Sequence, residues 1–252
     1  MGGEVASCSV EYQLALQGVK ATVIEGRGIG SQTSGFSAGG LNPLQGSGIP
    51  GPLGPLAMES YQMHRALYDA LMTENGIDYG WRTVSHLKVG FDEESLPELQ
   101  ETVDIFAGSD GFEANWLEPE DLINLEPRLG PGVIRGANTR GNASLDSYRY
   151  TLALAQGVER LGAKVCAGTV RGLKQSNGRV TGVVLEDSQI ACGQVVLAMG
   201  PWPRKAESWL DLYLLVDPLK GEILRVQLPG GSLRQDLTGG GASFYVKPNG
   251  LV

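Results

Sequence analysis

The first 27 residues constrain the fold most, because they pass from a helical pattern to a strand pattern across a single glycine. Residues 5–17 place apolar side chains at helical spacing, and Gly18 follows as the glycine that commonly ends a helix. The next segment, VKATVIEG at residues 19–26, is short and β-branched, as a buried strand is. This order predicts one helix–strand unit of a nucleotide-binding α/β fold.

The start of this unit overlaps the dinucleotide fingerprint, in which three glycines allow a tight turn, close approach of the pyrophosphate and helix packing. Residues 2–7, GGEVAS, keep only the first glycine, Gly2, while Ser7 is small enough for the packing position. Glu4 replaces the middle glycine. At about 4 Å and an effective dielectric constant of about 20, it would repel a phosphate by about 4 kcal/mol unless it turns to solvent.

Glu25 favours the nucleotide interpretation because it ends the predicted strand 18 residues after Ser7. An acidic residue at this place accepts hydrogen bonds from ribose hydroxyls. Taken alone, residues 1–27 leave two alternatives open, namely a nucleotide site or a short helix beside a strand.

The rest of the chain alternates between loops and predicted elements. Residues 26–55 are too rich in glycine and proline to be regular, and such long loops are often functional. Helices are predicted at 56–72, 94–107 and 119–126, and strands at 84–90 and 133–138. From Ser144 the helix–glycine–strand pattern returns, and later strands are predicted to include a buried run at 195–199 and antiparallel segments at 217–231 and 241–248.

This pattern predicts two domains, one interrupted by the other. We expect a nucleotide-binding domain over 1–80 and 144–215, and part of a mixed α+β domain over 81–143 and 216–252. The acidic cluster from Glu113 to Glu126 is interpreted as a solvated helix face.

Composition excludes several other classes of protein. The net charge of -8 and a pI near 4.9 argue against a nucleic-acid surface. No run of about 18 apolar residues could span a membrane, and no basic-then-apolar start predicts a signal peptide. The three cysteines are far apart and fit neither a disulfide framework nor a metal site, so we expect a cytoplasmic protein without a metal.

The segment GIGSQTSGFSAGGLNP at 28–43, with EGR before it, resembles the family of FAD-dependent amine and amino-acid oxidases. That family includes D-amino-acid oxidase, glycine oxidase and sarcosine oxidase. The resemblance continues, in family order, at GTV (168–170), VVLAMGPWP (195–203) and VDPLKGEILRVQ (216–227). It implies a Rossmann-like FAD-binding domain of the glutathione-reductase type, interrupted by a mixed α+β substrate domain.

The resemblance also implies which residues contact FAD. The positions implied for the adenosine and pyrophosphate are Gly2, Val5, Ala6, Glu25, Gly26, Thr33, Ser34 and Val170. The positions implied beside the flavin ring are Ala38, Gly39 and Gly40, and those of a second nucleotide-side turn are Ala198, Gly200 and Trp202. It identifies no catalytic side chain in this chain.

By this resemblance, the cofactor carries the chemistry. A hydride passes from the carbon beside a primary or secondary amine, of an amino acid for example, to the flavin. Water then hydrolyses the imine, and oxygen or another acceptor reoxidises the flavin. Three alternatives remain: a flavin dehydrogenase that uses another acceptor, a non-catalytic FAD- or ADP-binding module, and an NAD-dependent dehydrogenase. The loop at 28–40 argues against the last of these.

Family members begin with a buried strand before the first glycine and continue beyond the position of Val252. Here Met1 adjoins Gly2. We therefore expect a chain that is truncated at both ends, binds FAD poorly and has little turnover.

Overall fold

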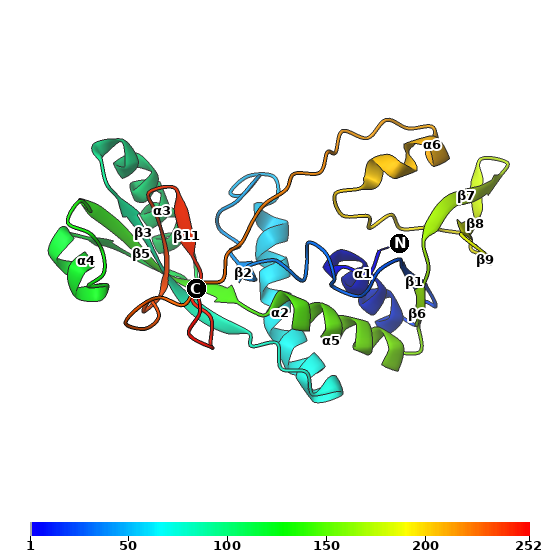
Figure 1. The fold of residues 1–252 in the computed structure, drawn as a ribbon, viewed down its shortest axis with the longest axis horizontal. Helices are drawn as coiled ribbons and strands as arrows, with labels where there is room; N and C mark the ends of the chain where they lie inside the picture. The colour runs from blue at the N-terminus through cyan, green and yellow to red at the C-terminus, as the bar shows by residue number, and fades with distance from the viewer. Residues whose placement is uncertain (1) are drawn as a thin grey trace. The chain divides into compact units, whose positions relative to one another are not determined.

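The computed structural model describes residues 2–252, so Met1, which adjoins the fingerprint, lies outside the described residues. Contacts divide the chain into two compact units (Figure 1). Unit 1 comprises residues 2–37, 68–79 and 146–223, and unit 2 comprises residues 38–67, 80–145 and 224–252. By contacts, residues 38–67 therefore group with unit 2, whereas the sequence-based division puts them in the nucleotide-binding domain.

Unit 1 is built from helix–strand pairs. Helix α1 (Val5–Leu16) packs against α5 (Ser147–Arg160), and β1 (Thr22–Glu25) pairs in parallel with β6 (Lys164–Ala167) (Figure 1). The two helices can approach closely because residue 157 is glycine. A Cβ atom at this position would lie only 2.7 Å from the Tyr12 ring. Asp146 caps α5 by accepting a hydrogen bond from the N–H of Arg149.

The remainder of unit 1 is a small antiparallel sheet and two short helices. The sheet has the order β7–β8–β9, and its strands are Val170–Ser176, Arg179–Leu185 and Gln189–Ala191. The short helices are η2 (Pro203–Ala206) and α6 (Glu207–Leu210). Helix α2 (Gly54–Asn75) contributes its residues from 68 onward to unit 1 and its earlier residues to unit 2.

Unit 2 is a six-stranded sheet with helices. Its strand order is β11–β10–β3–β5–β2, and β4 also pairs with β5. All pairs are antiparallel except that of β10 with β3. The strands are β2 (Gly40–Leu41), β3 (Arg82–Gly90), β4 (Glu113–Leu117), β5 (Arg135–Ser144), β10 (Asp236–Gly239) and β11 (Ala242–Phe244). The helices are η1 (Glu93–Ser95), α3 (Leu96–Ala107) and α4 (Pro119–Leu125).

The core of unit 2 lies where α4 covers the sheet. Leu87 and Val89 of β3 are buried with Leu122 of α4 and Val133. The structure confirms all four helices predicted before residue 130 and the strands predicted at 19–26 and 84–90. It also confirms a strand at 133–138, but this strand, β5, runs from Arg135 to Ser144.

The predicted buried strand at 195–199 is wrong. This segment has no strand backbone, and Val196 is 52% exposed. With Val195 it lines a groove of about 650 Å³ whose other walls include Val10 of α1 and Val23 of β1. Within residues 2–252, β1 pairs with β6 alone, so no strand there supplies the ladder of hydrogen bonds that a buried strand needs.

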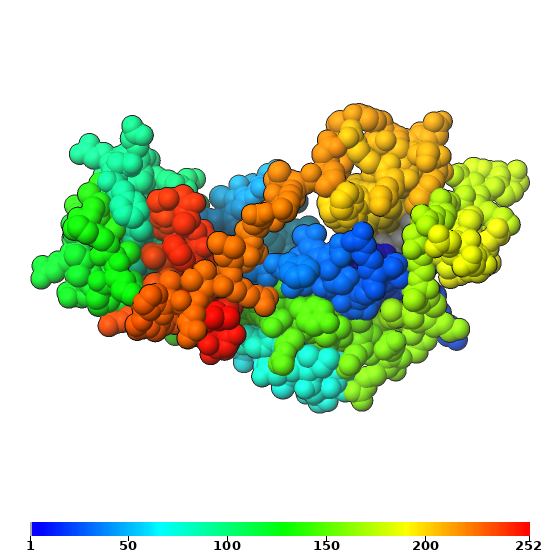
Figure 2. Space-filling model, viewed as in Figure 1, coloured from blue at the N-terminus to red at the C-terminus, as the bar shows by residue number. Residues whose placement is uncertain are grey.

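The predicted antiparallel strand at 217–231 is also wrong. The segment is irregular, and the Leu219 and Leu224 side chains are 94% and 78% exposed. Figure 2 shows this part of the chain, in orange, on the surface facing the viewer. Val226 exchanges two backbone hydrogen bonds with Val252, which is too short a pairing to form a strand. The prediction at 241–248 holds for Ala242–Phe244, which form β11.

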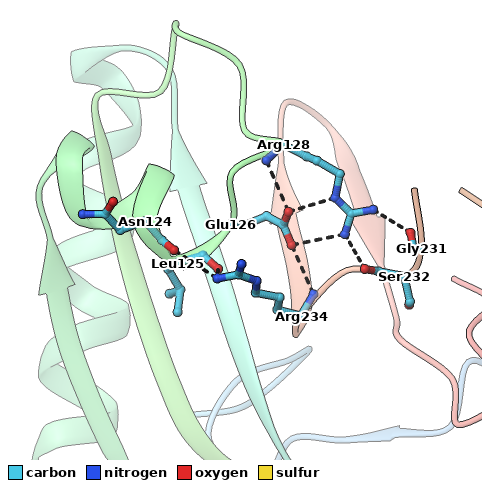
Figure 3. A network of polar contacts seen from close by, with 7 residues as sticks. All are labelled: Asn124, Leu125, Glu126, Arg128, Gly231, Ser232 and Arg234. Atoms are coloured by element: carbon cyan, nitrogen blue, oxygen red, sulfur yellow. Dashed lines mark hydrogen bonds and ion pairs between the residues drawn. The ribbon is translucent and has the colours of Figure 1, made fainter. Parts of the chain in front are cut away.

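The interpretation of the acidic cluster as a solvated helix face is wrong, because Glu113 begins strand β4 and Glu126 is only 3% exposed. Its carboxylate accepts hydrogen bonds from the Arg128 guanidinium and from the N–H of Arg234 (Figure 3). The same guanidinium donates to the carbonyl groups of Gly231 and Ser232, and the Arg234 side chain donates to the last carbonyls of α4. This network ties the segment before β10 to the end of α4.

The network changes the pKa of Glu126. Burial alone would raise it, but the hydrogen bonds from Arg128 and from the N–H of Arg234 hold the pKa below its ordinary value of 4.5. A carboxyl with a lowered pKa in the folded state stabilises the protein above its unfolded-state pKa. That contribution is lost as the pH falls through the folded-state value.

We predict that Glu126→Gln lowers the free energy of unfolding by about 1–3 kcal/mol near neutral pH, because charged hydrogen bonds to a buried group are lost. The difference from wild type should shrink as the pH falls below 4.5. Urea denaturation at about pH 7 and about pH 3 measures this difference. Glu120→Gln, which changes an exposed carboxyl of α4, the helix just before Glu126, is the matched control and should have little effect. A loss of stability that is the same at both pH values would contradict the charge-based account.

Candidate cofactor site

In unit 1 the start of α1, the end of β1 and the loop after β1 are joined by backbone hydrogen bonds. The N–H of Gly2 donates to the carbonyl of Ile24, and the N–H of Gly30 donates to the carbonyl of Gly3. Gly3 is buried, and a Cβ atom there would lie 2.7 Å from the Ile29 side chain. The glycine therefore lets the loop come directly against the beginning of α1.

Glu25 lies at the end of β1, as predicted, and faces the start of α1. Its carboxylate oxygens accept hydrogen bonds from the N–H groups of Gly3, at 2.5 Å, and Arg27, at 2.7 Å. A carboxylate has about four lone-pair positions, so capacity for ribose hydroxyls is left. The carboxylate is half-exposed and held by the backbone on two sides. This is an arrangement that can bind a diol.

Glu4 does not turn to solvent. Its two carboxylate oxygens accept hydrogen bonds from the N–H groups of Gln32, at 3.0 Å, and Ser34, at 2.7 Å. The Ser34 hydroxyl in turn accepts a hydrogen bond from the N–H of Val5, at the first turn of α1. These N–H groups are suited to an anion, and the anion that they hold is a side chain of the protein.

The other positions implied in unit 1 differ in their surroundings. Thr33 is exposed between Gln32 and Ser34, and Ala6 is exposed on α1. Gly26 lies beside Thr169, whose hydroxyl oxygen would be 3.2 Å from an added Cβ atom. Val170 begins β7 directly after that residue.

The second nucleotide-side turn, which carries Ala198, Gly200 and Trp202, contacts the fingerprint at Gly2. The carbonyl oxygen of Ala198 lies against Gly2, since a Cβ atom on Gly2 would be 2.3 Å from it. Gly200 has a φ of +54°, which suits glycine. Trp202 is 46% exposed, and the Lys205 ammonium lies over its ring, 5.2 Å from the ring centroid, in a cation–π contact. The structure thus brings Ala198 to Gly2 and leaves Trp202 on the surface.

The implied flavin-side turn belongs to unit 2. Gly39 has a φ of +76°, and an added Cβ atom would lie 2.0 Å from the carbonyl oxygen of Leu145. The backbone of Gly39 also accepts a hydrogen bond from the N–H of Leu145, and Gly40 pairs with Ser144. The carbonyl of Ala38 accepts a hydrogen bond from the Lys247 ammonium. The close approach of backbone to backbone is one sufficient reason for glycine here.

We predict that Gly39→Ala destabilises the protein by about 1–3 kcal/mol, because it adds both a positive-φ penalty and a clash with Leu145. Gly241 offers a matched control, since its φ is +79° and no atom lies within 4 Å of an added Cβ. Gly241→Ala therefore measures the φ penalty alone. Chemical denaturation of both variants checks the prediction, and equal losses of stability would show that the Leu145 contact has no cost.

The described residues contain no other obvious reactive centre. His86 lies in β3 beside the Thr238 hydroxyl, and burial, aided by the Lys88 charge, lowers its pKa to about 4. Burial also lowers the pKa of His64. No group of three or more potential metal-binding side chains occurs in residues 2–252. Sequence reasoning missed the N–H of Gln32 and the Lys247 contact, since backbone donors and long-range pairs leave no residue pattern.

These features define a protein with an α/β unit of Rossmann-like type and a mixed α+β unit. Residues 2–251 match the family model described as FAD dependent oxidoreductase (DAO), and the chain belongs to this family. FAD is therefore the cofactor of its family, as predicted.

Curated relatives agree with this family. The chain is 26% identical over 253 residues to glycine oxidase of Geobacillus kaustophilus (strain HTA426), covering 99% of this chain and 66% of the relative. It is 28% identical over 238 residues to glycine oxidase of Bacillus licheniformis, covering 94% of this chain and 63% of the relative. The chain thus spans just under two thirds of the length of these two proteins. It is also 28% identical over 172 residues to D-amino acid dehydrogenase of Rhizobium johnstonii (strain DSM 114642 / LMG 32736 / 3841), covering 67% and 41%.

Solved structures confirm the fold class. The crystal structure of glycine oxidase from Bacillus cereus ATCC 14579 matches with a TM-score of 0.86 and 25% identity, over 99% of this chain and 69% of that one. The predicted Rossmann-like, FAD-binding oxidase fold is therefore correct. In residues 2–252 no helix is long and apolar enough to cross a membrane.

Proposed function

We propose that this chain is the FAD-binding part, with some of the substrate domain, of an oxidoreductase that oxidises the C–N bond of a primary or secondary amine or amino acid. Oxygen is the proposed acceptor. The observation that carries the proposal is structural: Glu25, Gly3 and the loop N–H groups lie together at the start of α1. The chain also matches the family from residue 2 to residue 251. The similarity to two glycine oxidases supports the class of substrate.

The donor set of unit 1 fits a dinucleotide in chemical type. Glu25 would accept hydrogen bonds from the ribose hydroxyls, with Gly26 and Val170 beside the adenosine. Gly2, Val5, Ala6, Thr33 and Ser34 would face the pyrophosphate, and Ala198, Gly200 and Trp202 would form the second nucleotide-side turn. In unit 2, Ala38, Gly39 and Gly40 would contact the flavin ring.

When bound, FAD supplies the hydride acceptor. The residues of the chain would bind and orient it. The backbone of the loop would hold the pyrophosphate, and the fixed turn at Gly39 would present backbone rather than side chains to the ring. We assign the nucleotide-binding domain to 1–80 and 144–215 and the substrate domain to 81–143 and 216–252. The unpaired thiols of Cys8, Cys166 and Cys192 support a reducing compartment such as the cytoplasm.

The similarity to a D-amino acid dehydrogenase favours one alternative, a flavin enzyme that passes electrons to an acceptor other than oxygen. Oxygen consumption, compared with reduction of an artificial dye, separates these two functions. A non-catalytic module would bind ADP or FAD, but no amine would reduce the bound flavin.

The proposal predicts selective binding of FAD. Titration of the purified chain, followed by flavin absorbance and fluorescence, should show FAD binding at least about tenfold tighter than NAD, with displacement by ADP. Glu25→Ala should weaken FAD binding by about tenfold, since charged hydrogen bonds to the ribose are worth more than about 1.4 kcal/mol. Anaerobic addition of glycine or a D-amino acid should then bleach the bound flavin. Preference for NAD would refute the proposal, and bound flavin that no amine bleaches would favour the non-catalytic module.

A further inference from the structure

The Glu4 carboxylate accepts hydrogen bonds from two N–H groups of the loop that carries Thr33 and Ser34, two positions implied for the pyrophosphate. Its oxygens lie 3.0 Å from the nitrogen of Gln32 and 2.7 Å from the nitrogen of Ser34. Gln32 and Ser34 flank the exposed Thr33. Their two N–H groups donate to the same carboxylate, that of Glu4. This is the geometry with which successive backbone N–H groups bind an anion.

Glu4 is committed to this loop rather than to its own helix. It occupies the N-cap position of α1, with extended backbone, but its side chain makes no capping hydrogen bond. Side chains at N-caps ordinarily accept a hydrogen bond from the first turn of their helix. Here the N–H of Val5 is instead satisfied by the Ser34 hydroxyl. The N–H of Val5 and the two loop N–H groups are thus all bound by groups of the protein.

A diphosphate would need the same donors. Its negative charge would be repelled by Glu4 at close range, and the N–H groups of Gln32 and Ser34 cannot donate strongly to both anions. The glycine that Glu4 replaces in the fingerprint has no side chain, and it leaves such donors open.

We propose that Glu4 is an internal anion that occupies the diphosphate position of the nucleotide site and competes with the diphosphate group of any dinucleotide. This inference rests on the proposed function for the identity of the ligand, but the competition concerns the anion alone. Binding of the nucleotide requires the Glu4 side chain to leave Gln32 and Ser34. The residue therefore sets a weak affinity for FAD and for ADP.

Inorganic pyrophosphate is the probe that tests the competition without the flavin. Isothermal titration of the full chain should show that Glu4→Gln and Glu4→Gly bind pyrophosphate at least about tenfold more tightly than wild type. Glu159→Gln, an exposed carboxyl on α5 of the same unit, removes the same charge and should leave the affinity within about twofold of wild type. Far-UV circular dichroism and thermal unfolding confirm that the variants are folded.

Variants that bind pyrophosphate no more tightly than wild type would overturn the inference, and so would an equal gain in Glu159→Gln. A second measurement follows the wild-type protein by hydrogen exchange. Without ligand, the amides of Gln32 and Ser34 should exchange with deuterium slowly, and pyrophosphate at the concentration that saturates Glu4→Gln should leave them unchanged. Exchange of these amides at the rate of an unstructured peptide would also overturn the inference.

The same samples, titrated separately with FAD, distinguish this inference from the proposed function. A gain in pyrophosphate affinity without FAD binding in any variant would refute the FAD function and leave the role of Glu4 standing. Equal FAD affinity in wild type and Glu4→Gln, with no gain for pyrophosphate, would refute the role of Glu4 and leave the FAD function standing.

Discussion

The arrangement of unit 1 depends on the hydrogen bonds that two carboxylates make to backbone N–H groups around the start of α1. Glu25 holds the N–H of Gly3 from the end of β1, and Glu4 holds those of Gln32 and Ser34 in the following loop. Because a charged acceptor roughly doubles the strength of a hydrogen bond, these contacts fix an otherwise irregular loop against the helix. The same N–H groups are the ones suited to bind a dinucleotide.

Local pattern was sufficient to predict most elements whose apolar residues have a clear period. The helix at 5–17 and the strand that ends at Glu25 were predicted because Gly18 separates apolar residues at helical spacing from a β-branched run. In the structure Gly18 has a φ of +76°. The strands predicted at 195–199 and 217–231 failed for another reason. Both segments have strand-like composition, but a strand forms only where a neighbour supplies the ladder, and composition carries no information about neighbours.

The site was predictable to the extent that a residue type reveals its backbone surroundings. Glu25 could be placed from spacing alone, and the need for glycine at Gly39 is explained by the Leu145 carbonyl. The direction of the Glu4 side chain was not predictable. The same glutamate can either repel a phosphate or accept hydrogen bonds from a loop, and the sequence does not show which of these it does. Burial of Glu126 was likewise hidden, because its partners Arg128 and Arg234 become neighbours only in the fold.

The central claim is that the start of α1, the end of β1 and the following loop form the FAD site. Amide hydrogen exchange of the full chain, with and without saturating FAD, tests it most directly. The account predicts that FAD slows exchange at residues 2–6 and 25–31, while the sheet of β3, β4 and β5 near the buried Glu126 stays unchanged. Protection confined to residues outside unit 1, or no change anywhere at saturation, would contradict it.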